Sequence, residues 1–227
     1  WNPPAGSVSK EEVLGNRSKY NIALPSTACA IAKKAFLNHL DSLPPDKKSV
    51  LVTVGGTGAG KGFAIKNNSA VKAIKDAVGA VWDSAGDANG TESPWILDEA
   101  KKRGIRVTYL HCHADPFFNW ADQGRGVISR AKLHGRMIDA AVFTDSYAIG
   151  NRNHYNFWQQ HKGDAKFLFF DMTGKKPAPV DVMPAAAVNI DPQKLYAHAM
   201  GTLAERADIS PEIRKGGSLN VRLWPPT

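Results

Sequence analysis

The sequence has few cysteines and no long apolar run. Its 227 residues include two cysteines, Cys29 and Cys112, too few for a disulfide framework, and we expect both as buried thiols in a reducing compartment. No stretch approaches the roughly 20 apolar residues of a membrane-spanning helix, so we expect no membrane partner. The chain starts at Trp1 without a signal-peptide pattern, and we expect it to be a piece: an expressed fragment, a processed product or the end of a larger protein.

The charge balance is basic, with a formal net charge of +8. This charge indicates either a generally basic surface or a site for polyanions such as nucleotides. Lys and Arg are spread along the chain rather than gathered into one run with interleaved aromatic residues. We therefore do not expect nucleic acid to be the main partner.

Short β-branched runs alternate with helix-like stretches through the middle of the chain. Strands are expected at 49–54, 80–83, 105–111 and 166–171, and helices at 25–43, 61–78, 94–103 and over most of 117–162. This alternation predicts an α/β fold with a parallel sheet flanked by helices. We expect an N-terminal arm with helices (1–47), a core (48–190), and a C-terminal helix with an irregular tail (191–227) on the same domain.

The segment 55–62 reads GGTGAGKG and carries the strongest functional signal. It fits the phosphate-binding pattern G-x-x-x-x-G-K, and a buried-type strand precedes it while a helix follows. Glycines let successive N–H groups face phosphates, and the lysine adds a positive charge. We expect a P-loop that binds ATP and Mg²⁺ through Gly55, Gly56, Thr57, Gly58, Ala59, Gly60, Lys61 and Gly62.

Gly62 departs from this pattern, which normally has Ser or Thr at the last position. The missing hydroxyl would ligate Mg²⁺. Either water or a carboxylate takes its place, or the protein is a weakened or disabled variant. Because Lys61 is retained, nucleotide binding is the firmer prediction and activity the less secure one.

Three further segments accompany the loop: AVWD at 80–83, GRGVISRAKLH at 124–134 and FFDMTG at 169–174. In order and spacing, the stretch 48–173 resembles the zeta toxin family, which includes a related effector kinase of plant pathogens. The resemblance implies a P-loop kinase fold and ATP-dependent phosphorylation of a sugar hydroxyl on UDP-N-acetylglucosamine or NAD. It also implies a toxin or effector that acts in the cytoplasm, delivered there or secreted, with an antitoxin or chaperone as protein partner.

Two carboxylates are candidates for the base that such a transfer needs. Asp83 is the first choice, because it ends a core strand where α/β folds bind ligands; a helix-capping or loop role is the alternative. Asp87 is the reserve, because the sequence SAGDANG at 84–90 is expected to be flexible enough to bring it into the same cleft. Either carboxylate could instead help to hold Mg²⁺.

Basic and imidazole side chains complete the expected site. Arg125 lies between two glycines, as suits a lid arginine that neutralises the transferred phosphoryl group. Arg130 and Arg136 follow on an expected helix but not on one face, so at most one joins it; a solvated basic face is the alternative. His111 and His113 share one side of a strand, and we expect His113 beside the substrate cleft rather than in a metal site.

Three functions therefore remain open. The first is a small-molecule kinase built on the loop, Asp83 and Arg125. The second, suggested by Gly62, is a nucleotide-binding module without catalysis. The third, suggested by the net charge of +8, is a nucleic-acid end kinase.

Overall fold

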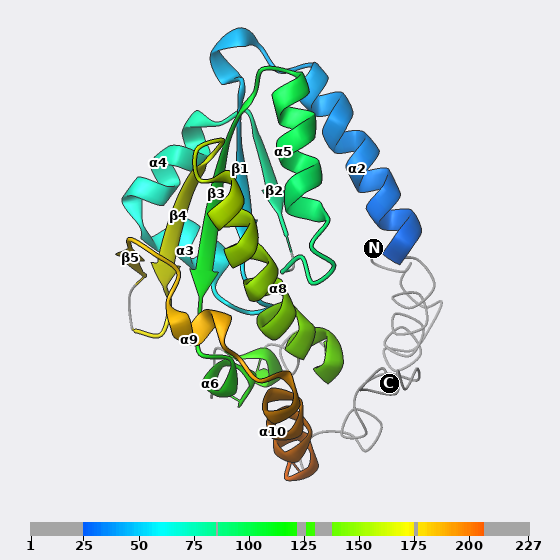
Figure 1. Cartoon of the computed structure of the whole chain (residues 1–227), viewed down its shortest axis with the longest axis vertical. Coiled ribbons are helices and arrows are strands. Elements are labelled where there is room, and N and C mark those ends of the chain that lie inside the picture. Colours follow the sequence, from blue (N-terminus) through cyan, green and yellow to red (C-terminus); the bar gives the residue numbers. More distant parts are fainter. Residues whose placement is uncertain (1–24, 85, 122–125, 130–137, 175–176, 207–227) are drawn as a thin grey trace, which may run out of the picture.

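The computed structural model describes residues 25–84, 86–121, 126–129, 138–174 and 177–206. They form a five-stranded sheet in the order β2-β1-β3-β4-β5, with helices packed on both of its faces (Figure 1). The fold is therefore α/β with a mostly parallel sheet, as the sequence predicts.

The strands lie close to their expected positions. The parallel strands are β1 (Ser49–Val54), β2 (Ala80–Asp83), β3 (Arg106–His113) and β4 (Lys166–Asp171). A short β5 (Ala178–Val180) pairs antiparallel with β4 at the edge. The sequence analysis did not anticipate β5, which contains Pro179; an edge strand tolerates proline because one of its sides makes no ladder.

The helices fall into three groups in Figure 1. One face of the sheet carries α5 (Glu92–Lys102) and α8 (Ala140–His161), with α2 (Pro25–Asp41) beside α5, and the other carries α3 (Lys61–Asn67) and α4 (Ser69–Ala77). Beyond the carboxyl ends of the strands lie α6 (Pro116–Ala121), α9 (Ala185–Val188) and α10 (Pro192–Ala204). A single turn of 3₁₀ helix, η1 (Pro45–Lys47), leads into β1.

The helix expected at 61–78 is two helices, which corrects the prediction. Asn68 is extended, with φ −117° and ψ 115°, and its side chain accepts a hydrogen bond from the N–H of Val71. It therefore ends α3 and caps α4, a role that asparagine favours over a helix-interior position.

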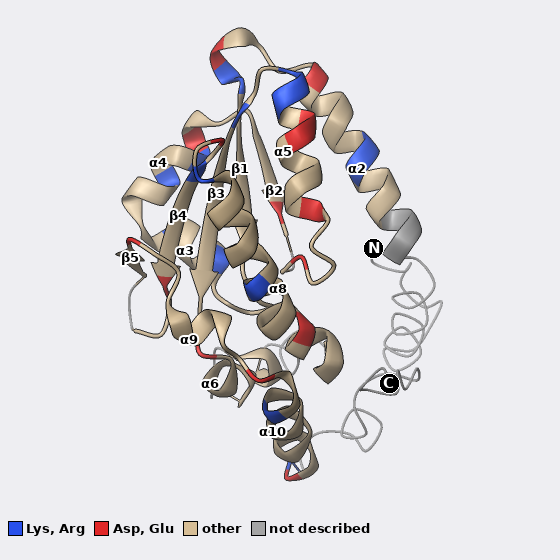
Figure 2. Ribbon diagram, in the orientation of Figure 1, with Lys and Arg blue, Asp and Glu red and all other residues tan. Residues whose placement is uncertain are grey.

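The strand β1 lies at the centre of the core. Val50, Val52 and Val54 pack in the cluster that includes α5, while Leu51 on the opposite face packs with α3 and α4. Burial on both faces explains the unbroken apolar run, which is typical of parallel strands. Figure 2 shows the strands largely free of charge except towards their ends. Among the described residues no helix is long and apolar enough to cross a membrane.

The two cysteines differ in their surroundings. Cys112 lies buried on β3, and burial raises the pKa of its thiol to about 12. Cys29 is exposed on α2, so the expectation that both are buried is wrong for Cys29. The neighbouring Ile31 is also 66% exposed, which shows that this part of α2 lies outside the core.

The loop between β2 and α5 is held against α8. A Cβ added at Gly150 would lie 1.7 Å from the carbonyl oxygen of Gly86. One turn later Asn153 donates from Nδ2 to the carbonyls of Asp87 (3.3 Å) and Ala88 (3.0 Å). This loop is therefore fixed by packing and hydrogen bonds, in contrast to the flexibility expected from its sequence.

This close approach predicts that substitution by alanine has very different effects on stability at two helix glycines. Gly150→Ala should destabilise the fold by about 2 kcal/mol or more, because the methyl group has no room without moving backbone. Gly201→Ala on α10, where a Cβ meets nothing within 4 Å, should be neutral or stabilising by up to ~1 kcal/mol through helix propensity. Urea unfolding of both variants measures the difference, and equal effects would contradict the packing described here.

Candidate functional site

The glycine-rich loop follows β1 at the carboxyl edge of the sheet. Gly58 and Gly60 have left-handed backbones, with φ of 82° and 88°, and α3 starts at the next residue, Lys61. Left-handed residues interspersed in a loop turn successive N–H groups towards one point, which is how backbone nests bind anions. The structure thus places left-handed glycines directly before the helix that begins at Lys61.

Lys61 lies back over this loop. Its Nζ donates a hydrogen bond to the carbonyl oxygen of Gly55 at 3.0 Å and lies 3.9 Å from Oδ1 of Asp83. The Lys61 side chain is 12% exposed, whereas that of Asp83 is 72% exposed. The ammonium is therefore held at the loop while the carboxylate faces solvent.

Asp83 ends β2 directly beside Thr53 of β1. The two residues are partners in the parallel register, so their side chains stand on the same face of the sheet. Thr53 Oγ1 donates to Asp83 Oδ1 at 2.5 Å. From the sequence, Asp83 was expected at the ligand-binding end of its strand, and the structure brings it to 3.9 Å from Lys61. No role for Thr53 was expected from the sequence.

Side chains from α6 and α8 hold the loop from the opposite side. The N–H of Thr57 donates to Ser146 Oγ at 3.1 Å, and Asn119 Nδ2 donates to the Thr57 carbonyl at 3.4 Å. Asn119 Nδ2 also donates to the hydroxyl of Tyr147 at 2.7 Å. The sequence analysis missed these three side chains, because no motif marks residues that reach the loop from remote helices.

Gly56 and Gly62 have different reasons to be glycine. A Cβ at Gly56 would lie 2.4 Å from the ring of Tyr147, so the ring leaves no room for a side chain. A Cβ at Gly62 meets nothing within 4 Å. Space therefore does not explain the missing hydroxyl at Gly62.

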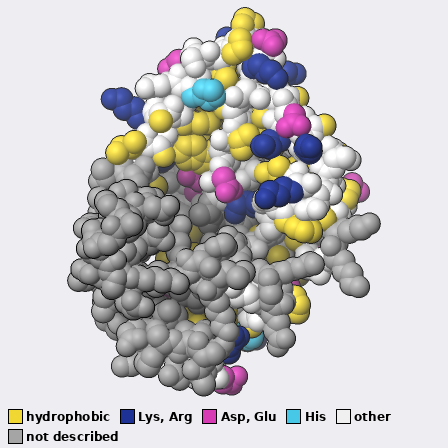
Figure 3. All heavy atoms as spheres, turned by 180° about the vertical axis from the view of Figure 1, so that it is seen from behind, with side chains coloured by type: hydrophobic (Ala, Val, Ile, Leu, Met, Phe, Trp, Pro, Cys, Tyr) yellow, Lys and Arg dark blue, Asp and Glu magenta, His cyan; other side chains and the backbone are white. Residues whose placement is uncertain are grey.

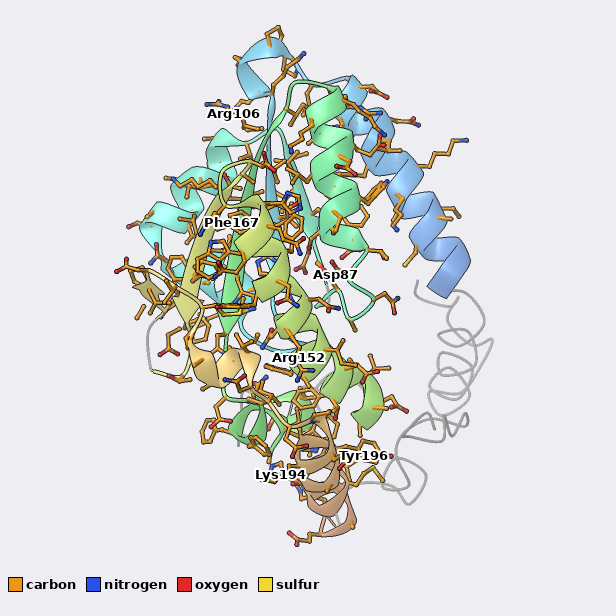
Figure 4. All side chains as sticks on the ribbon, viewed as in Figure 1. Asp87, Arg106, Arg152, Phe167, Lys194 and Tyr196 are labelled. Atoms are coloured by element: carbon orange, nitrogen blue, oxygen red, sulfur yellow. The ribbon has the colours of Figure 1, made fainter. Side chains whose placement is uncertain are left out.

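Asp87 has a structural task. Its Oδ1 accepts hydrogen bonds from the N–H groups of Thr91 (3.0 Å) and Glu92 (2.9 Å), and its Oδ2 accepts from Ser93 (2.8 Å). Figure 4 shows Asp87 beside the N-terminal end of α5, in the loop that joins β2 to α5. Both oxygens hold the first turn of α5, so the geometry does not favour Asp87 as a reserve base. These bonds also explain why α5 begins before the expected residue 94.

The remaining candidates do not join Lys61 in the described structure. Arg125, Arg130 and Arg136 lie outside the described residues. His113 is buried and shares its face of β3 with His111, which packs against α8, whereas Asp83 faces α3. Burial lowers the pKa of His113, although Asp171 and Asp115 act in the opposite direction. The side chains of His113 and Asp83 thus point to opposite faces of the sheet.

His111 and His154 form a buried stacked pair. Their ring centroids are 5.2 Å apart at an interplanar angle of 9°, and His111 Nε2 lies 3.1 Å from the Asn151 Oδ1 that accepts its hydrogen bond. Burial lowers the pKa of His111 well below its usual value and that of His154 to about 3. Because burial lowers both pKa values, the pair is a neutral part of the core at pH 7. Within the described ranges no group of three or more His, Cys, Asp or Glu that could hold a metal ion is found.

This pair predicts an acid-sensitive fold. In the unfolded chain a histidine binds a proton below pH ~6.5. In the folded protein His154 binds a proton only near pH 3. Stability should therefore fall as the pH drops below ~6.5, by up to ~1.4 kcal/mol per pH unit for each such histidine. Urea unfolding between pH 7.5 and 5 should show a smaller loss for His154→Phe than for the natural sequence. Equal slopes would contradict this assignment.

The basic residues near the loop lie mainly on α3 and α4. These helices carry Lys61, Lys66, Lys72 and Lys75. Figure 3 shows Lys and Arg side chains on the half of the rear face where these helices lie. These four lysines thus lie on the side of the sheet that Lys61 and Asp83 share.

A magnesium ion fits this edge through Asp83. Mg²⁺ keeps several waters and is held by one or two carboxylates together with substrate phosphates. Asp83 offers an exposed carboxylate beside the loop, whereas Asp171 Oδ1 is engaged by the N–H and hydroxyl of Thr173. The residues present therefore suit an ion that phosphates and water hold for the most part.

Comparison with known proteins does not assign a family. No protein-family model matches the chain, and no curated protein matches it. The described residues define an α/β protein with a glycine-rich loop, a lysine and a carboxylate at the carboxyl edge of its sheet.

Proposed function

We propose that the chain is an ATP-dependent small-molecule kinase of zeta-toxin type, with a P-loop at residues 55–62. One observation carries the proposal: Lys61 follows a glycine-rich loop and lies 3.9 Å from a strand-end carboxylate, Asp83. Phosphoryl transfer needs mainly positioning and electrostatic stabilisation. In this proposal Lys61 supplies the positive charge for the phosphates, and Asp83 supplies the carboxylate for the acceptor hydroxyl.

Each residue has a role in this proposal. Lys61 exchanges the Gly55 carbonyl for the outer phosphates of ATP. Asp83 orients an acceptor hydroxyl and takes its proton while the hydroxyl oxygen bonds to the γ-phosphorus and ADP leaves. Mg²⁺, when bound, neutralises phosphate charge. The products are a phosphate monoester and ADP, and the released proton passes through Asp83.

The acceptor is proposed from the resemblance to the zeta toxin family. It is a sugar hydroxyl on a nucleotide-type metabolite, UDP-N-acetylglucosamine or NAD. Such an activity depletes a nucleotide pool and suits a toxin or effector that acts in the cytoplasm of a target cell. A protein with this activity requires an antitoxin or chaperone to protect the producing cell.

The first test compares two lysines of one helix. Lys61→Met should weaken ATP binding at least tenfold, because a charge-assisted contact to phosphate contributes about 1.5–3 kcal/mol. Lys66→Met removes an exposed lysine from the same helix, α3, and should leave the affinity nearly unchanged. Isothermal titration with ATP and Mg²⁺ gives both values, and a similar loss in the two variants would argue against a loop-bound nucleotide.

Transfer itself is tested by mass spectrometry. The protein is incubated with ATP, Mg²⁺ and a mixture containing UDP-N-acetylglucosamine and NAD. We expect a gain of one phosphoryl group on one acceptor. Asp83→Asn should abolish the gain while ATP binding persists. Retained transfer in that variant would remove Asp83 from the mechanism.

A nucleotide-binding module without catalysis is the second candidate, and Gly62 is the observation that favours it. A side chain at this position meets nothing within 4 Å, so Gly62→Thr can restore the usual hydroxyl. Gly62→Val is its control, with the same shape and no hydroxyl. For a kinase we expect transfer at least tenfold faster in the Thr variant, because the hydroxyl ligates Mg²⁺.

Measurement of transfer and ATP affinity in both Gly62 variants separates the two candidates. Tight ATP binding without transfer in the natural chain and in both variants would favour the binding module. Equal transfer rates for Thr and Val would show that the hydroxyl has no catalytic use in this protein.

A further inference from the structure

Thr53 is an unusual residue for its position. It lies in β1, an inner strand between β2 and β3, is 1% exposed, and interrupts a run of valine and leucine. A buried hydroxyl costs free energy unless it makes a hydrogen bond. Thr53 makes that bond through Oγ1 to the carboxylate of Asp83.

Backbone register fixes this contact. Thr53 and Asp83 are directly paired in the parallel ladder, and the N–H of Ser84 donates to the Thr53 carbonyl at 2.9 Å. Backbone pairing thus holds the two strands together both before and after the contact between the side chains of Thr53 and Asp83. The orientation of Asp83 follows from the fold, although the side chain is largely exposed.

The same carboxylate oxygen faces two donors. Asp83 Oδ1 accepts from Thr53 at 2.5 Å, while Lys61 Nζ lies 3.9 Å away. Direct ammonium–carboxylate hydrogen bonds measure about 2.7–2.9 Å. Asp83 therefore bonds to the neutral hydroxyl and stays short of a direct bond with the nearby cation.

We propose that Thr53 is a positioning residue that keeps Asp83 from closing on Lys61. The inference rests on the proposed function: it leaves the lysine for the phosphates of ATP and the carboxylate for the acceptor hydroxyl. Without the Thr53 hydroxyl, the carboxylate turns to the adjacent ammonium and competes with the phosphates.

The test uses two variants of Thr53 and one combination. Thr53→Val keeps the shape of the buried side chain and removes the hydroxyl, whereas Thr53→Ser keeps the hydroxyl. We expect Thr53→Val to weaken ATP binding roughly tenfold and Thr53→Ser to bind as the natural chain does. In Thr53→Val/Asp83→Asn the affinity should equal that of Asp83→Asn alone, because a neutral amide does not compete for Lys61.

The combination separates positioning from damage to the strand. If Thr53→Val only disturbed β1, the loss of affinity would persist after Asp83→Asn is added. Such persistence would overturn the proposal, and so would natural affinity in Thr53→Val alone. Where transfer is measured, Thr53→Val should also lower kcat and Thr53→Ser should restore it.

A crystal structure of Thr53→Val tests the proposal without nucleotide. The Lys61 Nζ to Asp83 Oδ1 distance, 3.9 Å with Thr53 present, should shorten to about 2.8 Å. An unchanged distance would overturn the role of Thr53. Absence of ATP binding by the natural chain would instead overturn the proposed kinase, and the distance would still decide the role of Thr53.

Discussion

The pairing of β1 with both β2 and β3 is the constraint on which the candidate site depends. Parallel pairing places the carboxyl ends of these strands at one edge, where open α/β sheets bind ligands. The register sets Thr53 against Asp83, and the chain leaves β1 directly into the glycine-rich loop. One buried strand therefore fixes the loop, the lysine and the carboxylate relative to one another.

The helix α8 is the second support, and it acts on two loops at once. Its Ser146 and Tyr147 hold the glycine-rich loop, and its Gly150 and Asn153 hold the loop that follows Asp83. Contacts with one helix therefore hold both loops against the same element. Such preorganisation matters in phosphoryl transfer, where most of the catalysis comes from positioning.

Local patterns were sufficient for some parts of the structure and insufficient for others. The apolar runs located the four parallel strands, the loop pattern identified Lys61, and its place at a strand end identified Asp83. Asp87 was misjudged because a glycine-rich segment looks flexible, whereas its carboxylate caps α5. Thr53, Asn119 and Tyr147 went unnoticed because their roles depend on register and on contacts between segments remote in the sequence.

The side chains on the two faces of the sheet near the glycine-rich loop differ in charge. On the α3 side, the ammonium of Lys61 lies 3.9 Å from the carboxylate of Asp83, which solvent reaches. On the α8 side, burial lowers the pKa values of His111 and His154, and the charge of Lys61 lowers that of His111 further. Imidazoles that stay neutral add no positive charge near Lys61. In the proposed function, a phosphate group at the loop would therefore meet Lys61 on the face that also holds Asp83.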